Sequence, residues 1–170
     1  MNENIKIILE DERVINVTLY PEYAPISVEN FLHLIDINYF DGVIFHRIIE
    51  DFMIQTGGYY IKDNTLYEKE GAKTIKGEFL KNGVNNPLKH KKGTISMART
   101  NDPNSATSQF FLCSVDTPHL DGSYAAFGRA SDEESIKIIE DISKVPTGML
   151  SPAFQNFPYE PIIIKTIVRA

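Results

Sequence analysis

Only two stretches of this chain have the periodicity of an amphipathic α-helix, and most of its other apolar segments are short and alternate with polar residues as β-strands do. The first helical stretch repeats its apolar residues at spacings of three and four, which places them on one face. These residues are Val28, Phe31, Leu32 and Ile35. We expect this helix to begin with Ser27 as its N-terminal cap and to end near Asn38.

The second helical stretch begins at Ser131-x-x-Glu134, which has the spacing of a capping box. Four isoleucines supply its apolar face: Ile136, Ile138, Ile139 and Ile142. With only two helices, the chain lacks the regular strand–helix–strand alternation that is typical of parallel sheets.

The expected strands are Ile5–Leu9, Val14–Leu19, Val43–Ile48, Phe52–Gln55, Gly93–Ala98, Gln109–Ser114, Ala125–Arg129 and Ile162–Val168. Residues 56–92 are interrupted by glycines and weakly periodic, so we expect loops with short strands there. These patterns predict a mainly β protein, with an antiparallel barrel or sandwich and two covering helices.

Length and charge limit the class of protein. A chain of 170 residues with 42% hydrophobic and 24% charged residues is expected to form one domain over residues 1–170. No apolar run has the roughly 18 residues of a membrane span, and the start of the chain is polar and acidic, unlike a signal peptide. The net charge of −6 disfavours nucleic acid as a partner and is consistent with a monomer. The basic cluster at residues 89–92 is interpreted as a solvated loop.

Cysteine usage bears on the compartment. Cys113 is the single cysteine, so an internal disulfide cannot form, and we expect a cytoplasmic location.

Several kinds of active site have no counterpart in the sequence. It contains no Gly-x-x-x-x-Gly-Lys phosphate loop, no Gly-x-Gly-x-x-Gly dinucleotide turn and no Gly-x-Ser-x-Gly nucleophile elbow. The four histidines lack metal-ligand spacing. We therefore expect no cofactor and no metal.

Three long polar side chains stand in otherwise apolar strands: Arg47, Gln55 and Gln109. Strand alternation places Gln55 on the same face as Met53, and Gln109 on the same face as Phe111. An apolar cleft with a few polar groups is typical of a ligand site. For each residue taken alone, a structural role is favoured over a functional one. Arg47 would then pair with an acidic residue, the glutamines would bond to backbone, and the apolar residues would be ordinary core.

A family resemblance joins these residues into one site. Residues 45–55, FHRIIEDFMIQ, resemble the F-H-R-x-I-x-x-F-M-x-Q pattern of cyclophilin-type peptidyl-prolyl cis-trans isomerases. Residues 96–111, SMARTNDPNSATSQFF, are similar to the S-M-A…S-Q-F-F segment of the family in its bacterial form. Shorter matches occur at Ala24-Pro25, at residues 28–31, at Leu120-Asp121-Gly122 and at Phe127-Gly128. Together the matches cover nearly the whole chain.

The resemblance implies a closed eight-stranded antiparallel β-barrel capped by two helices, and an enzyme that rotates Xaa-Pro bonds without covalent chemistry. By motif position, Arg47 would be the catalytic arginine and Gln55 would bond the substrate carbonyl. The pocket for the proline ring would consist of Phe52, Met53, Phe111 and Leu120. Gln109 and Ala98 would line the adjoining groove, and the backbone of Arg99 would pair with the extended peptide. The implied partners are proline-containing peptides and unfolded or partly folded proteins.

The chain departs from the family pattern at three places. His119 stands where many members carry tryptophan, so the resemblance implies weakened binding of cyclosporin, the family's cyclic-peptide inhibitor. Tyr124 replaces a frequent histidine, and Gln-Thr-Gly-Gly at 55–58 replaces Gln-Gly-Gly. His119 and Tyr124 are still expected to contact substrate. Two other interpretations stay open, namely a proline-peptide binding module with vestigial catalysis, and a hydrolase.

Overall fold

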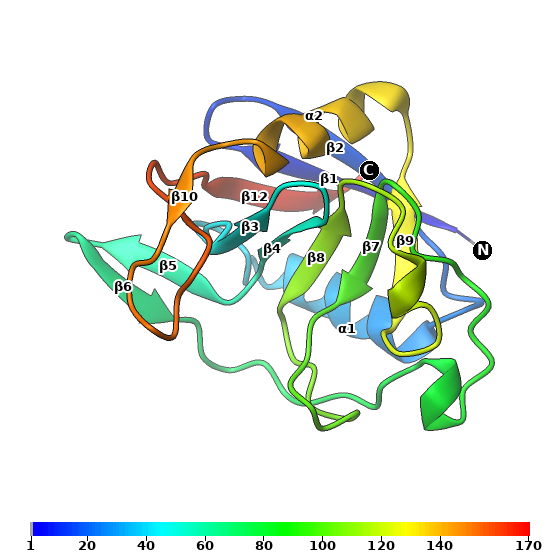
Figure 1. The fold of residues 1–170 in the computed structure, drawn as a ribbon. Coiled ribbons are helices and arrows are strands. Elements are labelled where there is room, and N and C mark those ends of the chain that lie inside the picture. The colour runs from blue at the N-terminus through cyan, green and yellow to red at the C-terminus, as the bar shows by residue number, and fades with distance from the viewer. Residues whose placement is uncertain (1) are drawn as a thin grey trace.

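The computed structural model describes residues 2–170 and contains two α-helices, α1 (Pro25–Asp36) and α2 (Glu133–Ser143) (Figure 1). The strands are β1 (Glu3–Leu9), β2 (Val14–Leu19), β3 (Arg47–Ile49), β4 (Met53–Thr56), β5 (Tyr59–Lys62), β6 (Thr65–Glu68), β7 (Thr94–Met97), β8 (Phe110–Cys113), β9 (Ala126–Ala130), β10 (Thr147–Gly148), β11 (Phe157–Pro158) and β12 (Ile164–Arg169). Two single turns of 3-10 helix lie at Leu80–Asn82 and Pro118–Leu120.

Eight strands form one antiparallel sheet in the order β12-β1-β2-β9-β7-β8-β4-β3. The expected mainly β fold with two helices is therefore confirmed. Full closure of the barrel is an overstatement, because β3 and β12 do not pair as strands. Just before these two edge strands, Ile44 and Ile163 form an isolated bridge, and the Phe45 N–H donates to the Ile162 carbonyl at 3.0 Å.

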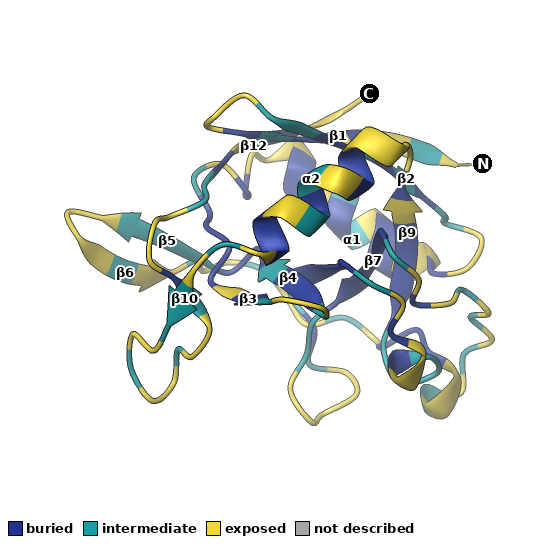
Figure 2. Ribbon diagram, turned by 45° about the horizontal axis from the view of Figure 1, so that its top comes forward, coloured by how far each residue is buried: buried dark blue, intermediate teal, exposed yellow. Residues whose placement is uncertain are grey.

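The helices lie on opposite sides of this sheet, α2 at the top of Figure 1 and α1 below it. Helix α2 turns its buried isoleucines toward the strands and its charged face toward solvent (Figure 2). The core contains a cluster of aromatic rings whose centroids are 5.1–5.6 Å apart, namely Phe31, Phe40, Phe110 and Phe127. Because the interior is filled by these side chains, a binding site has to lie on the outside of the sheet.

The start of α1 differs from the expectation. The helix begins two residues earlier than Ser27, and its cap position, Ala24, has no side-chain acceptor. Glu78, from a distant loop and only 2% exposed, supplies the acceptor instead. Its carboxylate accepts from the Ile26 N–H at 3.1 Å and from the Ser27 N–H and hydroxyl at 2.6 and 2.7 Å. A carboxylate at a helix N-terminus satisfies unpaired N–H groups and complements the helix dipole.

Two other local expectations also need correction. Asp132, and not Ser131, caps α2, because its Oδ1 accepts from the Ser135 N–H at 2.8 Å. The expected strand over residues 43–48 is confined to Arg47–Ile49, and the residues before it form only isolated bridges.

Residues 56–92 contain loops and two short strands, as expected. Strands β5 and β6 form a hairpin that projects from the main sheet, and the short β10–β11 ribbon lies beside it (Figure 1). The basic cluster at 89–92 is not wholly solvated, because His90 is 1% exposed and packs in the interior.

Candidate active site

Strand alternation directs a second set of side chains outward from the sheet. On β8, Phe110 and Leu112 belong to the main core, whereas Phe111 and Cys113 belong to a separate apolar cluster. On β4, Ile54 faces the main core and Met53 faces the separate cluster. Since successive residues of a strand point to opposite faces, Gln55 shares the outward face with Met53.

The pairing register aligns the candidate residues across three strands. Arg47 of β3 is opposite Gln55 of β4, and Gln55 is opposite Phe111 of β8. The next row contains Ile49, Met53 and Cys113. The guanidinium, the amide and the aromatic ring therefore stand side by side on one surface, as the sequence analysis required.

A cavity of about 330 Å³ lies over this surface. Its lining residues are His46, Arg47, Phe52, Met53, Gln55, Tyr59, Ala98, Arg99, Phe111, Leu120, Tyr124, Ala153, Phe154 and Gln155. Nine of the eleven residues expected from the sequence line it. Of the other two, Gln109 bonds to Gln55, and the exposed His119 lies outside with its ring 5.6 Å from that of Phe52.

A chain of hydrogen bonds connects the polar groups. Arg47 Nη1 donates to Gln55 Oε1 at 3.2 Å, and Gln55 Nε2 donates to Gln109 Oε1 at 2.9 Å. Within residues 2–170, Arg47 forms no ion pair with an acidic residue, so its interpretation as a structural ion-pair partner is wrong. The two glutamines likewise bond to each other through their side chains. The guanidinium is exposed and is left available to a ligand.

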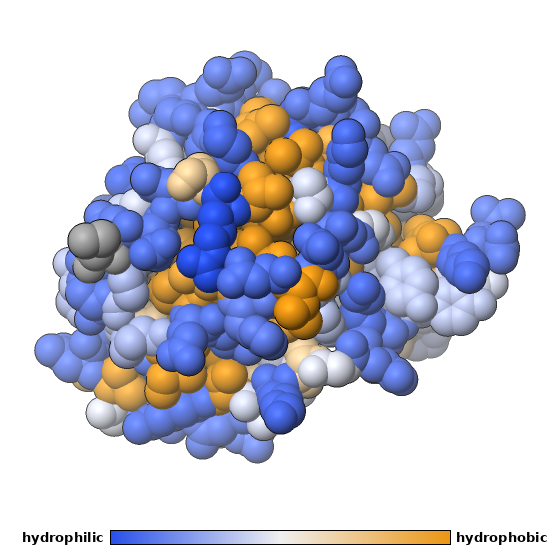
Figure 3. Space-filling view, turned by 180° about the vertical axis from the view of Figure 1, so that it is seen from behind, coloured by the Kyte–Doolittle hydropathy of each residue, from blue (hydrophilic) through white to orange (hydrophobic). Residues whose placement is uncertain are grey.

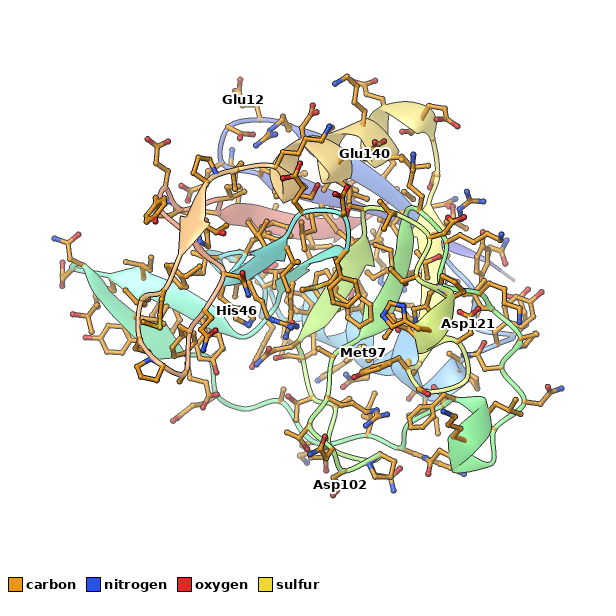
Figure 4. The ribbon with its side chains drawn as sticks, in the orientation of Figure 1. Glu12, His46, Met97, Asp102, Asp121 and Glu140 are labelled. Atoms are coloured by element: carbon orange, nitrogen blue, oxygen red, sulfur yellow. The ribbon has the colours of Figure 1, made fainter. Side chains whose placement is uncertain are left out.

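His46 lies beside these hydrogen-bonded side chains and is buried, with 6% of its surface exposed. Burial, together with the positive charge of Arg47, lowers the pKa of His46 to about 4. The ring is therefore neutral near pH 7. In the described part of the chain its Nδ1 has no hydrogen-bond partner. In Figure 4, His46 lies toward the β10–β11 ribbon, whereas Asp121 lies on the other side, toward β9.

Arg99 and Tyr124 form the opposite wall of the cavity. The Arg99 guanidinium is sandwiched between the rings of Phe79 and Tyr124, 4.7 and 4.6 Å from their centroids. It also donates to the carbonyls of Ser123 and Thr100. Tyr124 in turn packs edge-on against Phe111, with 5.9 Å between centroids. The Arg99 side chain is thus held in place by cation–π contacts and backbone acceptors.

One hydrogen-bonded triad was missed by the sequence analysis. His90 Nδ1 lies 3.0 Å from Asp121 Oδ1, and His90 Nε2 lies 2.9 Å from Ser96 Oγ. This order resembles the triad of a serine hydrolase. Ser96, however, is 0% exposed, so its hydroxyl is out of reach of a substrate. The His90 ring stacks on Phe111 with 6.1 Å between centroids and supports the pocket from within.

Five lining residues were not among the expected site residues: His46, Tyr59, Ala153, Phe154 and Gln155. His46 lies inside the expected strand Val43–Ile48 and belongs to the matched motif, and Tyr59 begins β5 in the region where short strands were expected. Residues 153–155 come from the segment between α2 and β12, which has no helical or strand periodicity. No local signal points from that segment to the site.

In residues 2–170, no group of three or more His, Cys, Asp and Glu side chains is placed to hold a metal ion. Neither helix of the described chain is long and apolar enough to cross a membrane.

Comparisons with known proteins agree in their result. A family model described as "Cyclophilin type peptidyl-prolyl cis-trans isomerase/CLD" matches residues 5–169. A peptidyl-prolyl cis-trans isomerase of Acinetobacter baylyi is 38% identical over 158 residues, which cover 90% of this chain and 78% of the relative. Peptidyl-prolyl cis-trans isomerase B of Escherichia coli is 35% identical over 159 residues, covering 89% and 90%.

Solved structures agree with these sequence matches. A Cryptosporidium parvum cyclophilin type peptidyl-prolyl cis-trans isomerase, solved in the presence of the dipeptide Ala-Pro, superimposes with a TM-score of 0.77. It is 28% identical, and the match covers 99% of each chain.

Proposed function

The chain belongs to the family of cyclophilin-type peptidyl-prolyl cis-trans isomerases and is an isomerase of this type, and we propose that Arg47 is its catalytic residue. The observation that carries this proposal is the row of Arg47, Gln55 and Phe111 across β3, β4 and β8. It places a guanidinium that has no ion-pair partner within residues 2–170 at the edge of an apolar pocket.

The apolar part of the cavity receives the proline ring. Met53, Phe111 and Leu120 are buried in one cluster, and Phe52 packs against it from the rim. A pocket with no hydrogen-bonding side chain at its floor suits the ring of proline, which has no N–H to donate. The ring is held while the peptide on the other side of the bond turns.

The reaction requires no nucleophile. Rotation about the Xaa-Pro bond is opposed by a barrier of about 18–20 kcal/mol, because amide resonance is lost in the twisted state. In that state the prolyl nitrogen recovers its lone pair. A guanidinium directed at the nitrogen or at the rotating carbonyl stabilises the twisted form more than either planar isomer. Lowering the barrier by roughly 7 kcal/mol accelerates exchange about 10⁵-fold.

In this mechanism Gln55 binds the substrate carbonyl and orients the Arg47 guanidinium. Its Oε1 faces the guanidinium, which has only donors, so its Nε2 faces Gln109. The amide nitrogen carries two hydrogens, and Gln109 takes one of them. The second hydrogen is available to a substrate carbonyl.

Substrates on this proposal are proline-containing peptides, including unfolded or partly folded proteins. The Ala-Pro dipeptide present with the Cryptosporidium structure supports this class. Ala98 lines the cavity, and its own N–H is taken by the Gln109 carbonyl at 2.9 Å. Arg99 follows directly after it at the wall, where its backbone is available to an extended peptide.

The remaining proposals rest on single features. Residues 1–170 form one domain, the single cysteine favours a cytoplasmic location, and the net charge of −6 favours a monomer. Cyclosporin binds weakly, because His119 stands where many family members carry tryptophan and its ring lies outside the cavity lining, 5.6 Å from the ring of Phe52. Titration of the protein with cyclosporin tests this, and submicromolar affinity would contradict it.

Two-dimensional exchange NMR on a short Ala-Pro peptide tests the central proposal. Exchange cross-peaks between cis and trans signals are expected with catalytic amounts of the protein. Arg47→Ala is expected to lower kcat/KM about 10²- to 10³-fold, as loss of a transition-state donor does elsewhere. Its melting temperature is expected to stay unchanged, because Arg47 is exposed and forms one 3.2 Å hydrogen bond.

The matched control is Arg13→Ala, which removes another arginine, whose side chain is 37% exposed and, within residues 2–170, bonds only to Asp11. Wild-type turnover by Arg47→Ala would overturn the assigned mechanism. Peptide line-broadening without accelerated exchange would instead favour the binding module. A change of substrate mass would favour the hydrolase, although the one serine–histidine–aspartate triad described above is buried.

A further inference from the structure

The segment between α2 and β12 is unusual in composition. Residues 145–159, VPTGMLSPAFQNFPY, contain no charged residue, in a chain in which 24% of residues are charged. Within residues 2–170, nine large apolar side chains are exposed, and three of them lie here: Met149 (68%), Leu150 (56%) and Tyr159 (73%). We refer to residues 145–159 as the ribbon segment. An exposed apolar surface next to a site indicates a binding function more often than single apolar residues do.

The ribbon segment has a defined structure. Strands β10 and β11 pair within it, and at its tip the Leu150 N–H donates to the Phe154 carbonyl at 2.9 Å. Gly148 lies against the Tyr159 ring so closely that a Cβ there would clash with the tyrosine hydroxyl. The segment is therefore a shaped surface, held by its own backbone bonds.

The ribbon segment is attached to the strand that carries the catalytic arginine. The N–H of Ile48, next to Arg47, donates to the Asn156 carbonyl at 2.9 Å. Figure 1 shows the ribbon next to β3 and the β5–β6 hairpin. Its surface is thus continuous with the site.

Phe154 is the residue that extends this surface into the cavity. It lines the cavity together with Arg47, and its ring packs edge-on against Tyr59, with centroids 5.0 Å apart and planes at 88°. Phe157 packs edge-on behind it at 6.3 Å, and the His46 ring lies 6.5 Å away. Phe154 is half-buried, so one side of its ring is left for a ligand.

From these contacts we propose that the ribbon segment is a second substrate-binding surface, with Phe154 as its specificity-determining residue. The occupant is an apolar side chain of the substrate polypeptide. It lies near the proline, in the part of the substrate chain that runs from the proline pocket past Arg47. This inference rests on the proposed function and names the substrate class, namely unfolded polypeptides with apolar residues on that flank. The lack of charge suits such chains, because no ionic group has to be desolvated when they bind.

Apolar residues on the reverse face do not offer a comparable surface. That face is largely hydrophilic, with apolar areas at its centre and lower left that are bordered by hydrophilic residues (Figure 3). Val168 of β12, for example, is 36% exposed but is opposite Lys6 and followed by Arg169. It lines no part of the catalytic cavity.

The test compares peptides that differ at one position. Two series of six-residue peptides share an Ala-Pro bond and carry either Leu or Ser, two residues before the proline in one series and two residues after it in the other. The readout is the ratio of kcat/KM for the Leu peptide to that for the Ser peptide, from exchange NMR. Because both substrates meet the same enzyme preparation, a partial loss of folded protein cancels.

For the wild-type protein, the Leu-to-Ser ratio of kcat/KM is expected to be roughly fivefold in the series whose variable residue meets the ribbon segment, because one leucine side chain is then partly buried. In the other series the ratio is expected to be near one. Phe154→Ala, and the double variant Met149→Ser with Leu150→Ser, are expected to bring the larger ratio close to one. The matched control is Ile37→Ser, which removes a side chain 55% exposed at the end of α1. It is expected to keep the wild-type ratio.

Three results would overturn the inference. The first is a wild-type ratio near one in both series, and the second is a fivefold ratio that both ribbon variants retain. The third is a wild-type dimer in analytical ultracentrifugation that the double variant converts to monomer, because a second copy would then cover the ribbon. Failure of the proposed function is recognised separately, since it would abolish exchange of the short Ala-Pro peptide by the wild-type protein.

Discussion

Gln109 is expected to act on the reaction through Arg47, and Gln109→Leu tests this. The substitution removes the acceptor of the 2.9 Å bond from Gln55 Nε2 but keeps a side chain of similar size. The Gln55 amide then loses the contact that fixes its orientation, and its 3.2 Å bond to the guanidinium becomes one of several arrangements. A neutral hydrogen bond contributes about 1 kcal/mol net, because water replaces part of it at a half-buried site.

One such bond corresponds to a roughly fivefold loss of kcat/KM, measured by exchange NMR on the Ala-Pro peptide. The decisive measurement is a double-mutant cycle. If Gln109 acts only by holding Gln55 and hence Arg47, the same substitution made in Arg47→Ala is expected to change kcat/KM less than about twofold. A fivefold loss in both backgrounds would refute this reasoning and show that Gln109 acts independently of Arg47, either through the contact of Gln55 with the substrate carbonyl or on the substrate directly.

Four more predictions concern stability, pH and the groove. Glu78→Ala is expected to lower the free energy of unfolding by about 2–4 kcal/mol, because three donors at the start of α1 lose a buried acceptor; an unchanged melting temperature in thermal circular dichroism would contradict it. The isomerisation rate is expected to be flat from about pH 6.5 to 8.5, since arginine and glutamine do not titrate there and His46 is already neutral; a bell-shaped profile would indicate proton transfer by a histidine. Because the pKa of His46 is about 4 when folded and 6.5 when unfolded, the unfolded state takes up the proton first, and stability is expected to fall by on the order of 3 kcal/mol between pH 6.5 and 4. Urea unfolding of His46→Gln should show a smaller loss over that range, and an identical loss would exclude the assignment. Gly58→Ala is expected to lower kcat/KM as Gln109→Leu does, because the new Cβ would lie 2.7 Å from the Gln109 side chain; wild-type exchange kinetics would show that the side chain can move aside.

The identity of the elements was predictable because it depends on neighbouring residues. Alternation along Val14–Leu19 and the three-and-four spacing of the first helix were enough to assign strand and helix. The helix starts were less predictable. Ser27 has the right chemistry for a cap, yet the acceptor that α1 uses belongs to Glu78, 51 residues away.

The members of the site were predictable in kind but not in arrangement. Alternation alone placed Gln55 beside Met53, and the motif resemblance identified Arg47. The β3–β4 pairing joins residues eight apart, as in a hairpin, whereas the β4–β8 pairing joins Gln55 to Phe111 across 56 residues. A register of that kind depends on every strand and loop between the two, and no local pattern encodes it.

Sequence by itself therefore determined the mainly β class, the two helices, the apolar pocket residues and the presence of a polar arginine–glutamine set. Tertiary structure alone decided the row that brings Arg47, Gln55 and Phe111 together and the incomplete closure between β3 and β12. It also decided the burial of His90 and the place of Phe154 in the cavity wall. The physical reason is the range of the interactions: periodicity reports which face of an element is apolar, whereas register, long-range caps and loop docking depend on contacts between residues far apart in the chain.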